Sequence, residues 1–213
     1  MKQPSTELYI RGLIAQGEHR QQDFKFEIAD ARKIAKTLSA FANTAGGRLL
    51  VGVKDNGRIS GIRSEEEVYM LQSAAEMFCT PSPNYELQTH IVEHKQVLVA
   101  TVHPSTARPI CAKDEHGRAW AYVRMADETL LASPVHLQIW KQENNTVDEV
   151  TPFTDQEQQL LARLADSPPL ALSAICRLSD LSRPATIRLL ARLVRYELMH
   201  ILYTDHCFHF QLK

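Results

Sequence analysis

The sequence lacks an excess of basic residues, a long hydrophobic run and closely spaced cysteines. Lysine and arginine together number 24 and aspartate and glutamate 25, for a formal net charge of −1. Any contact with a nucleic acid must therefore come from a local basic patch rather than from the charge of the whole chain. No run of about eighteen apolar residues occurs, so we expect no membrane span and no membrane partner. The N-terminal residues carry no apolar stretch of the kind found in signal peptides.

The four cysteines, Cys79, Cys111, Cys176 and Cys207, lie far apart in the chain. Because no C-x-x-C pair is present, the sequence indicates neither a zinc ribbon nor a disulfide framework. We expect four free thiols and a cytoplasmic protein. The sequence also has no G-x-x-x-x-G-K-[ST] phosphate loop, so we do not expect an ATPase.

The composition is that of a folded protein with two domains. Its 213 residues are 44% hydrophobic and 23% charged, values near the averages of globular proteins. The polar stretch at 143–152 shows no periodicity and ends in a proline, which is typical of a linker. We therefore predict an α+β protein with one domain over residues 1–142 and a smaller domain over residues 153–213.

Helices and strands are mixed in the predicted first domain. Asp30 is placed to cap a helix with one apolar stripe, and Gly46 and Gly47 end that helix. A strand at 48–53 is expected to lead through a turn at 55–57 to a partner strand at 58–62. The other predicted elements are a helix at 65–78, paired strands at 86–92 and 96–102, a strand at 119–124 and a helix at 133–141.

The predicted second domain has the element order of a winged helix-turn-helix. Thr154 and Glu157 form a capping box at the start of its first helix. A short helix at 172–178 and a helix capped by Ser182 follow, and two short strands at 200–203 and 207–212 complete the order.

The third helix of this domain is the predicted DNA-reading element. In a winged helix-turn-helix this helix enters the major groove, and its first residues contact the bases. Arginine can form paired hydrogen bonds with guanine or bind phosphate. Arg188, Arg192 and Arg195 are spaced to share one face opposite the apolar stripe. The predicted nucleic-acid contacts of this helix are Arg183, Thr186, Arg188 and Arg192.

Two segments of the first domain carry a family resemblance. Asp23-Phe24-Lys25 is followed at 39–62 by SAFANTAGGRLLVGVKDNGRISGI. This pattern resembles the Schlafen-type AlbA-like DNA-binding family, which reads E-x-F-K, then a helix ending A-F-A-N-x-x-G-G, then a strand with G-V-x-D-x-G. The resemblance covers about residues 7–142. Bacterial members are often labelled divergent ATPases or transcriptional regulators, and many carry an added winged helix, which implies a DNA-binding transcriptional regulator.

Several residues of the resembling segment have expected structural or binding roles. Asn43, Gly46 and Gly47 are expected to form a structural turn, with glycine N–H groups free to approach a phosphate. A basic groove is expected from Lys25, Arg48, Lys54 and Arg124, with Arg58 beside it, and would bind with a strong dependence on salt.

The resemblance also implies an alternative, a metal-dependent nuclease. Vertebrate Schlafen proteins that cut tRNA and rRNA use three carboxylates in this region, and the matching positions here are Glu18, Asp23 and Asp55. Three converging carboxylates can hold Mg²⁺ or Mn²⁺ and activate water. The sequence departs from the family at Asp23, where the family usually has glutamate.

The sequence leaves three functions open. The favoured one is a DNA-binding regulator without catalytic residues or cofactor, whose partner is double-stranded DNA. The second is the nuclease, which would need Mg²⁺ or Mn²⁺. The third is a non-catalytic protein-assembly module. Exposed strand edges would allow a homodimer.

Overall fold

The computed structural model describes residues 6–144 and 152–213 and has the predicted mixture of helices and strands. The chain divides into two compact units, Met1–Leu131 and Ala132–Lys213. This boundary falls earlier than the predicted one at residue 142, because helix α4 (Pro134–Asn144) packs along α7 (Arg183–Arg195) in the second unit. The predicted linker at 143–152 lies mostly outside the described residues.

A four-stranded sheet in the order β1-β2-β5-β4 forms the centre of the first unit. Its strands are β1 (Gln22–Lys25), β2 (Gly47–Val51), β4 (Tyr85–Val92) and β5 (Lys95–Val102). β1 and β2 are parallel, and the other pairs are antiparallel. Side chains on both faces of β2 and β5 are buried, which explains why their sequences are almost continuously apolar.

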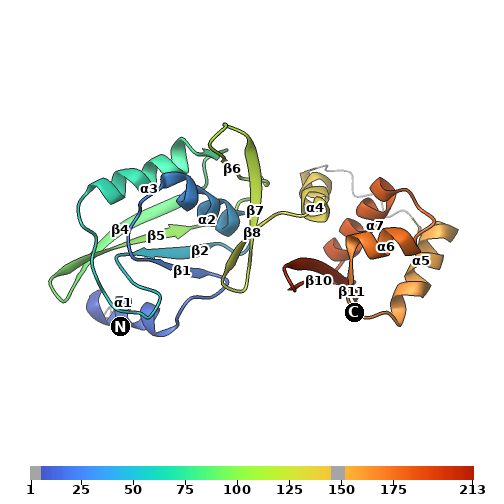
Figure 1. Cartoon of the computed structure of the whole chain (residues 1–213), viewed down its shortest axis with the longest axis horizontal. Helices are drawn as coiled ribbons and strands as arrows, with labels where there is room; N and C mark the ends of the chain where they lie inside the picture. Colours follow the sequence, from blue (N-terminus) through green and yellow to red (C-terminus); the bar gives the residue numbers. More distant parts are fainter. Residues whose placement is uncertain (1–5, 145–151) are drawn as a thin grey trace. The chain divides into compact units, whose positions relative to one another are not determined.

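Helices cover both faces of this sheet. α2 (Ala31–Asn43) and α3 (Glu66–Glu76) pack on one face around Leu49, Leu98 and Ala100 (Figure 1). On the other face, α1 (Thr6–Ala15) contributes Ile10 and Leu13 to a second apolar cluster. The turn between β4 and β5 consists of Glu93 and His94 with φ of 54° and 59°, as the predicted hairpin requires.

A second sheet, in the order β3-β6-β7-β8, packs against α2. Its strands are β3 (Cys79–Thr80), β6 (Cys111–Lys113), β7 (Ala119–Met125) and β8 (Glu128–Leu131). Because α2 lies between two sheets, every residue from Thr37 to Asn43 is buried, and not only one stripe. Ala40 and Ala42 suit this position because small side chains let the sheets approach the helix closely.

One predicted strand of the first unit does not form. The turn at 55–57 is present, since the N–H of Gly57 donates to the carbonyl of Lys54 at 2.7 Å. After it, residues 58–62 make only an isolated bridge between Val53 and Ile59. The segment then bonds to other parts of the chain, with the N–H of Ile62 donating to Gln96. The prediction of a partner strand at 58–62 is therefore wrong.

The second unit has the predicted order of three helices and a strand pair. α5 (Asp155–Ala165) begins with the capping box of Thr154 and Glu157, and Ser182 caps α7. The remaining elements are α6 (Leu172–Leu178), β9 (Leu170–Ala171), β10 (Met199–Thr204) and β11 (Cys207–Leu212). β11 pairs with both β10 and β9.

α4 belongs to the second unit, whereas the sequence placed this helix in the first domain. Its buried face includes His136 and Trp140, and the His136 ring packs edge-on against Phe208 at 5.0 Å. Burial lowers the pKa of His136 to about 4. His136 is therefore neutral at neutral pH and belongs to the core rather than to a charged surface.

No helix within residues 6–144 and 152–213 is long and apolar enough to cross a membrane. All four cysteines are free thiols, as predicted.

Candidate nucleic-acid interface

The Gly46–Gly47 turn is a close-packing feature of the first unit. Gly46 has φ of +72°, and a Cβ there would lie 2.7 Å from the carbonyl oxygen of Val102. A Cβ on Gly47 would overlap the ring of Phe41. The N–H of Gly46 donates to the carbonyl of Phe41 at 2.9 Å, so it is not free for a phosphate, contrary to our expectation. The glycines are needed because β2 starts in contact with α2 and the end of β5.

Asn43 joins α2 to the second sheet. Its side-chain amide donates to the carbonyls of Ile110 and Tyr122 at 2.8 and 2.9 Å, and its oxygen accepts from the N–H of Ile110 at 2.8 Å. The side chain is 2% exposed. Asn43 therefore has a structural role, as predicted, but it connects distant segments rather than closing the local turn.

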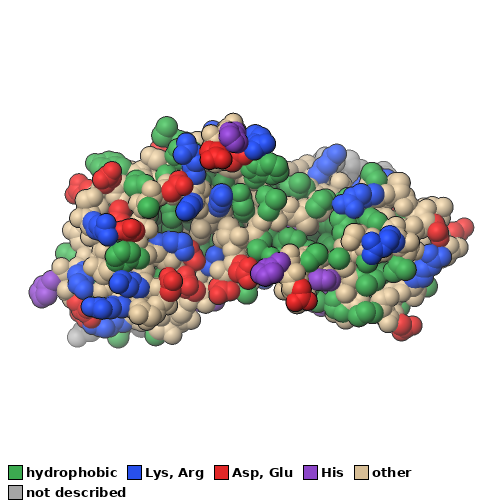
Figure 2. Space-filling view, in the orientation of Figure 1, with side chains coloured by type: hydrophobic (Ala, Val, Ile, Leu, Met, Phe, Trp, Pro, Cys, Tyr) green, Lys and Arg blue, Asp and Glu red, His purple; other side chains and the backbone are tan. Residues whose placement is uncertain are grey.

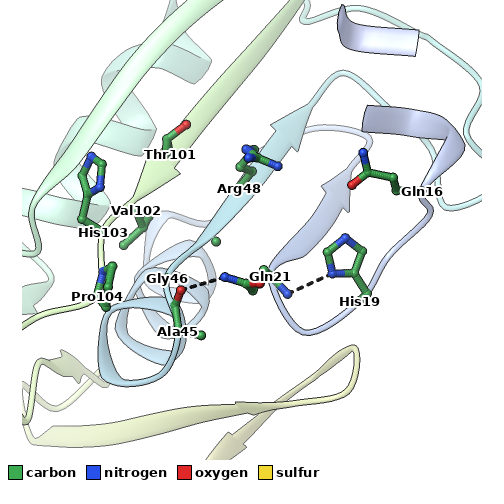
Figure 3. A pocket seen from close by; sticks show the side chains of 11 residues that line it. Gln16, His19, Gln21, Ala45, Gly46, Arg48, Thr101, Val102, His103 and Pro104 are labelled. Carbon is green, nitrogen blue, oxygen red and sulfur yellow. Dashed lines mark hydrogen bonds between the residues drawn. The ribbon is translucent and has the colours of Figure 1, made fainter. Parts of the chain in front are cut away.

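A polar hollow of about 300 Å³ lies beside this turn. Figure 3 shows Arg48 of β2 in its centre, with Gln16, His19 and Gln21 on one side and Thr101 and His103 on the other. Within the described residues, the half-buried guanidinium of Arg48 makes no hydrogen bond or ion pair. An unpaired cation in a polar hollow is suited to an anionic ligand such as a phosphate.

The sequence indicated Arg48 but none of its neighbours in the hollow. His19 and Gln21 precede β1, whereas Thr101 and His103 lie at the end of β5. These segments meet because β2 pairs with β1 on one side and with β5 on the other. No local sequence signal marks such a meeting.

Arg124 is buried and cannot form part of a basic groove. Only 2% of it is exposed, and its guanidinium donates to Asp23 at 2.9 Å, to Thr129 at 3.0 Å and to the carbonyl of Gln22 at 3.3 Å. It also lies over the ring of Phe41, 5.3 Å from its centroid. The prediction that Arg124 contacts nucleic acid is therefore wrong, since an enclosed guanidinium with these partners joins β7 to β1 instead.

The other predicted basic residues of the first unit lie near one another beyond the end of β2, since the N–H of Lys54 donates to the carbonyl of Arg58 and the N–H of Val53 to the carbonyl of Lys25. Lys25 pairs with Asp23 at 2.7 Å. Lys54 is exposed and its ammonium lies 4.9 Å from the ring centroid of Phe26. Arg58 is exposed on the turn after β2. Lys54 and Arg58 remain accessible to a phosphate.

The three carboxylates of the nuclease alternative do not form a metal site. Asp23 is 4% exposed and holds Arg124 through one oxygen and Lys25 through the other. Glu18 accepts from the N–H of Phe24 at 2.9 Å. Burial raises the pKa of Glu18 above its ordinary value, and the neighbouring Asp23 carboxylate adds to the rise.

Asp55 lies apart from this pair on an exposed turn. Among residues 6–144 and 152–213, no group of three or more His, Cys, Asp or Glu side chains could hold a metal ion. The predicted grouping of Glu18, Asp23 and Asp55 is therefore wrong, and these residues do not fit Mg²⁺ or Mn²⁺.

α7 presents a narrower basic surface than predicted. Arg183 and Arg188 are exposed. Thr186 is fully buried and its hydroxyl donates to the carbonyl of Ser182 at 3.2 Å. Arg192 pairs with Glu157 of α5 at 3.1 Å and lies over the ring of Phe153. The predicted DNA contacts of Thr186 and Arg192 are therefore wrong, because both side chains are used inside the unit.

Comparisons with known proteins place the first unit in a family. The sequence profile of the family described as Schlafen, AlbA_2 matches residues 18–133. An uncharacterized ATP-binding protein of Ureaplasma parvum serovar 3 is 31% identical over 94 residues, which are 40% of this chain and 26% of that protein. The chain thus corresponds to about a quarter of that relative's length.

Two solved structures are similar at low identity. A Corynebacterium diphtheriae protein is 18% identical with a TM-score of 0.49, covering 97% of this chain and 43% of that one. The other is the N-terminal domain of a Nitrosomonas europaea protein related to the ATP-dependent DNA helicase RecG. It is 21% identical with a TM-score of 0.42, covering 72% of this chain and 97% of that domain.

Because the family profile matches more than half of the residues, the chain belongs to the Schlafen, AlbA_2 family.

Proposed function

We propose that this protein is a DNA-binding transcriptional regulator whose second unit is a winged helix-turn-helix. The proposal depends chiefly on α7, which begins with the exposed Arg183 and continues to the exposed Arg188. Base contacts in this class of domain come from the N-terminal part of the third helix.

The hollow around Arg48 supplies a second contact in this proposal, with a backbone phosphate. The first unit then adds affinity without reading sequence, since phosphate contacts position a protein on DNA and base contacts specify the site. Lys54 and Arg58 are further exposed cations of this unit.

We expect Arg188→Ala to weaken binding of a specific duplex by roughly ten- to a hundredfold, because a paired contact to a base edge is lost. The probe is a fluorescein-labelled duplex recovered by selection from a random-sequence pool, and the readout is fluorescence anisotropy. Arg188→Lys distinguishes a contact to a base edge from a contact to a phosphate, because lysine keeps the charge but not the forked geometry that a base edge requires.

Lys141→Ala is the control for Arg188→Ala, since it removes an exposed cation of α4 in the same unit. Unchanged affinity of Arg188→Ala would remove α7 as the reading helix. If the intact chain binds no nucleic acid even at low salt, the protein-assembly alternative is favoured instead.

Arg48→Ala is expected to lower the slope of log Kd against log salt by about one, because one phosphate contact is lost. The relative preference for the selected duplex over a scrambled one should stay the same. Arg20→Ala is the matched control, because Arg20 is exposed nearby but does not line the hollow. A slope equal to that of the unmodified protein would show that the hollow holds no DNA phosphate.

A further inference from the structure

Three cation–aromatic pairs lie on the first unit, on residues that none of the proposed contacts uses. Arg32 lies over the ring of Phe78 at 4.9 Å, and Lys36 lies 5.8 Å from the ring centroid of Tyr122. The guanidinium of Arg118 is 5.9 Å from the ring centroid of Trp120. We call these six residues the aromatic–basic surface.

The pairs are connected through α2 and β7. Arg32 and Lys36 are four residues apart on α2, so they lie on the same side of that helix. Trp120 and Tyr122 are two residues apart on β7 and therefore point to the same side of the second sheet. Lys36 of α2 lies over the ring of Tyr122 of β7. The side chains of α2 and those of β7 therefore form one surface. In Figure 2, basic side chains lie over α2 and beside the β6–β7 hairpin, with acidic ones at the hairpin tip.

Trp120 is exposed and held in a fixed orientation. It is 41% exposed, and its indole N–H donates to Asp114 at 3.0 Å. The same carboxylate accepts from the guanidinium of Arg118 and from the backbone N–H groups of His116 and Arg118. These hydrogen bonds lower the pKa of Asp114 well below its usual range, and the bond from Trp120 has the largest effect. Asp114 therefore remains ionised at neutral pH and keeps the ring in place.

The combination of aromatic and basic side chains fits one class of ligand. Single-stranded nucleic acids offer unpaired bases that stack on aromatic rings or guanidinium planes, together with a phosphate backbone that attracts cations. A duplex offers no base faces, because its bases are stacked and paired. An acidic protein would be attracted to Arg32, Lys36 and Arg118 but would have no need of an oriented, exposed indole.

We propose that the aromatic–basic surface binds single-stranded nucleic acid by stacking a base on Trp120, while Lys36 and Arg118 contact the backbone phosphates. This goes beyond the proposed function, because it uses a different surface and a different form of nucleic acid. The two surfaces can therefore be tested separately.

The chain offers a direct probe of this stacking. Its two tryptophans are Trp120 and Trp140, and Trp140 is only 3% exposed. In a Trp140→Phe background the emission therefore reports Trp120 alone. Titration with oligothymidylate of about twelve nucleotides, which cannot pair with itself, should quench this emission in a saturable manner.

Affinities are then compared by anisotropy of the labelled oligonucleotide. Trp120→Ala should raise its Kd by about tenfold, and Trp120→Phe should retain most of the affinity. Tyr69→Ala is the control, since it removes an aromatic ring of the same unit that is 64% exposed but lies outside the surface. Thermal unfolding of each variant checks that the fold is kept. If Trp120→Ala does not fold, the affinity of Trp120→Phe for the oligonucleotide is compared with that of the unmodified protein instead.

Inorganic polyphosphate distinguishes stacking from charge, because it has phosphates but no bases. It should compete with the oligonucleotide without quenching Trp120. Binding of oligothymidylate with no quenching, or with the same Kd in Trp120→Ala, would overturn the inference and leave only electrostatic attraction.

The duplex and single-strand assays separate this inference from the proposed function. Arg188→Ala should lose duplex binding and keep oligothymidylate binding, and Trp120→Ala should do the reverse. Duplex binding without oligothymidylate binding overturns only the inference. Oligothymidylate binding with quenching but without duplex binding overturns only the proposed function, and absence of both overturns both.

Discussion

Asp23→Ala is expected to destabilise the first unit by about 3–5 kcal/mol, because it leaves a buried cation without its counter-ion. Arg124 is 2% exposed and its guanidinium donates to Asp23 at 2.9 Å. The side chain has no route to solvent in the folded unit, and its remaining partners, Thr129 and the carbonyl of Gln22, are uncharged. The measurement is denaturant unfolding followed by Trp120 emission in the Trp140→Phe background, which reports the first unit.

A double variant separates the cost of an orphaned charge from the value of the ion pair. Replacing a buried pair with apolar side chains of similar size is often neutral or stabilising. Asp23→Leu combined with Arg124→Met should therefore be more stable than Asp23→Ala alone. Asp127→Ala is the control at an exposed position. A loss below about 1 kcal/mol in Asp23→Ala would contradict the assignment of Arg124 as a buried, charge-paired residue.

Asn43→Ala should also cost about 2–4 kcal/mol, because three backbone groups lose a hydrogen bond at once, and only one of them, the carbonyl of Ile110, keeps another side-chain donor, the hydroxyl of Ser39 at 2.8 Å. The groups are the N–H and carbonyl of Ile110 and the carbonyl of Tyr122. Each is far from Asn43 in sequence, so no local rearrangement can replace these hydrogen bonds. The free energy of unfolding of the first unit, measured in the same way, checks this expectation.

Asn43→Asp provides the more specific comparison. A carboxylate could still accept from the N–H of Ile110, but it would face two carbonyl oxygens without donating to either, and only the carbonyl of Ile110 would keep another side-chain donor, Ser39. We expect Asn43→Asp to be at least as destabilising as Asn43→Ala. Asn84→Ala, at an exposed side chain, should change stability by less than about 0.5 kcal/mol. A mild effect of Asn43→Asp would mean that the two donated bonds contribute little.

Helix starts and tight turns were predicted well because they depend on neighbouring residues. Asp30 accepts from the N–H of Arg32 at 2.8 Å, and Thr154 and Glu157 form the expected reciprocal cap. Glu93 and His94 close the expected hairpin. Each feature is fixed by hydrogen bonds within a few residues, so the pattern of the sequence is enough to predict it.

The roles of the basic residues were predicted poorly because charge alone does not indicate exposure. Arg124 and Arg192 are as basic in sequence as Arg48 and Arg188. In the structure Arg124 pairs with Asp23 and Arg192 with Glu157, partners from distant elements. No spacing rule connects such residues, and only the tertiary structure, which brings Arg124 to Asp23 and Arg192 to Glu157, decides which arginines remain available.

The segment from Ser39 to Arg48 illustrates both kinds of information. The sequence by itself determined that a helix ends there in two glycines and that the chain resembles the Schlafen, AlbA_2 family. Only the tertiary structure decided that α2 lies between two sheets, that Asn43 holds Ile110 and that Arg48 faces a polar hollow. The physical reason is that helix and turn formation is local, whereas burial, ion pairing and cavities depend on chain segments that meet only after folding.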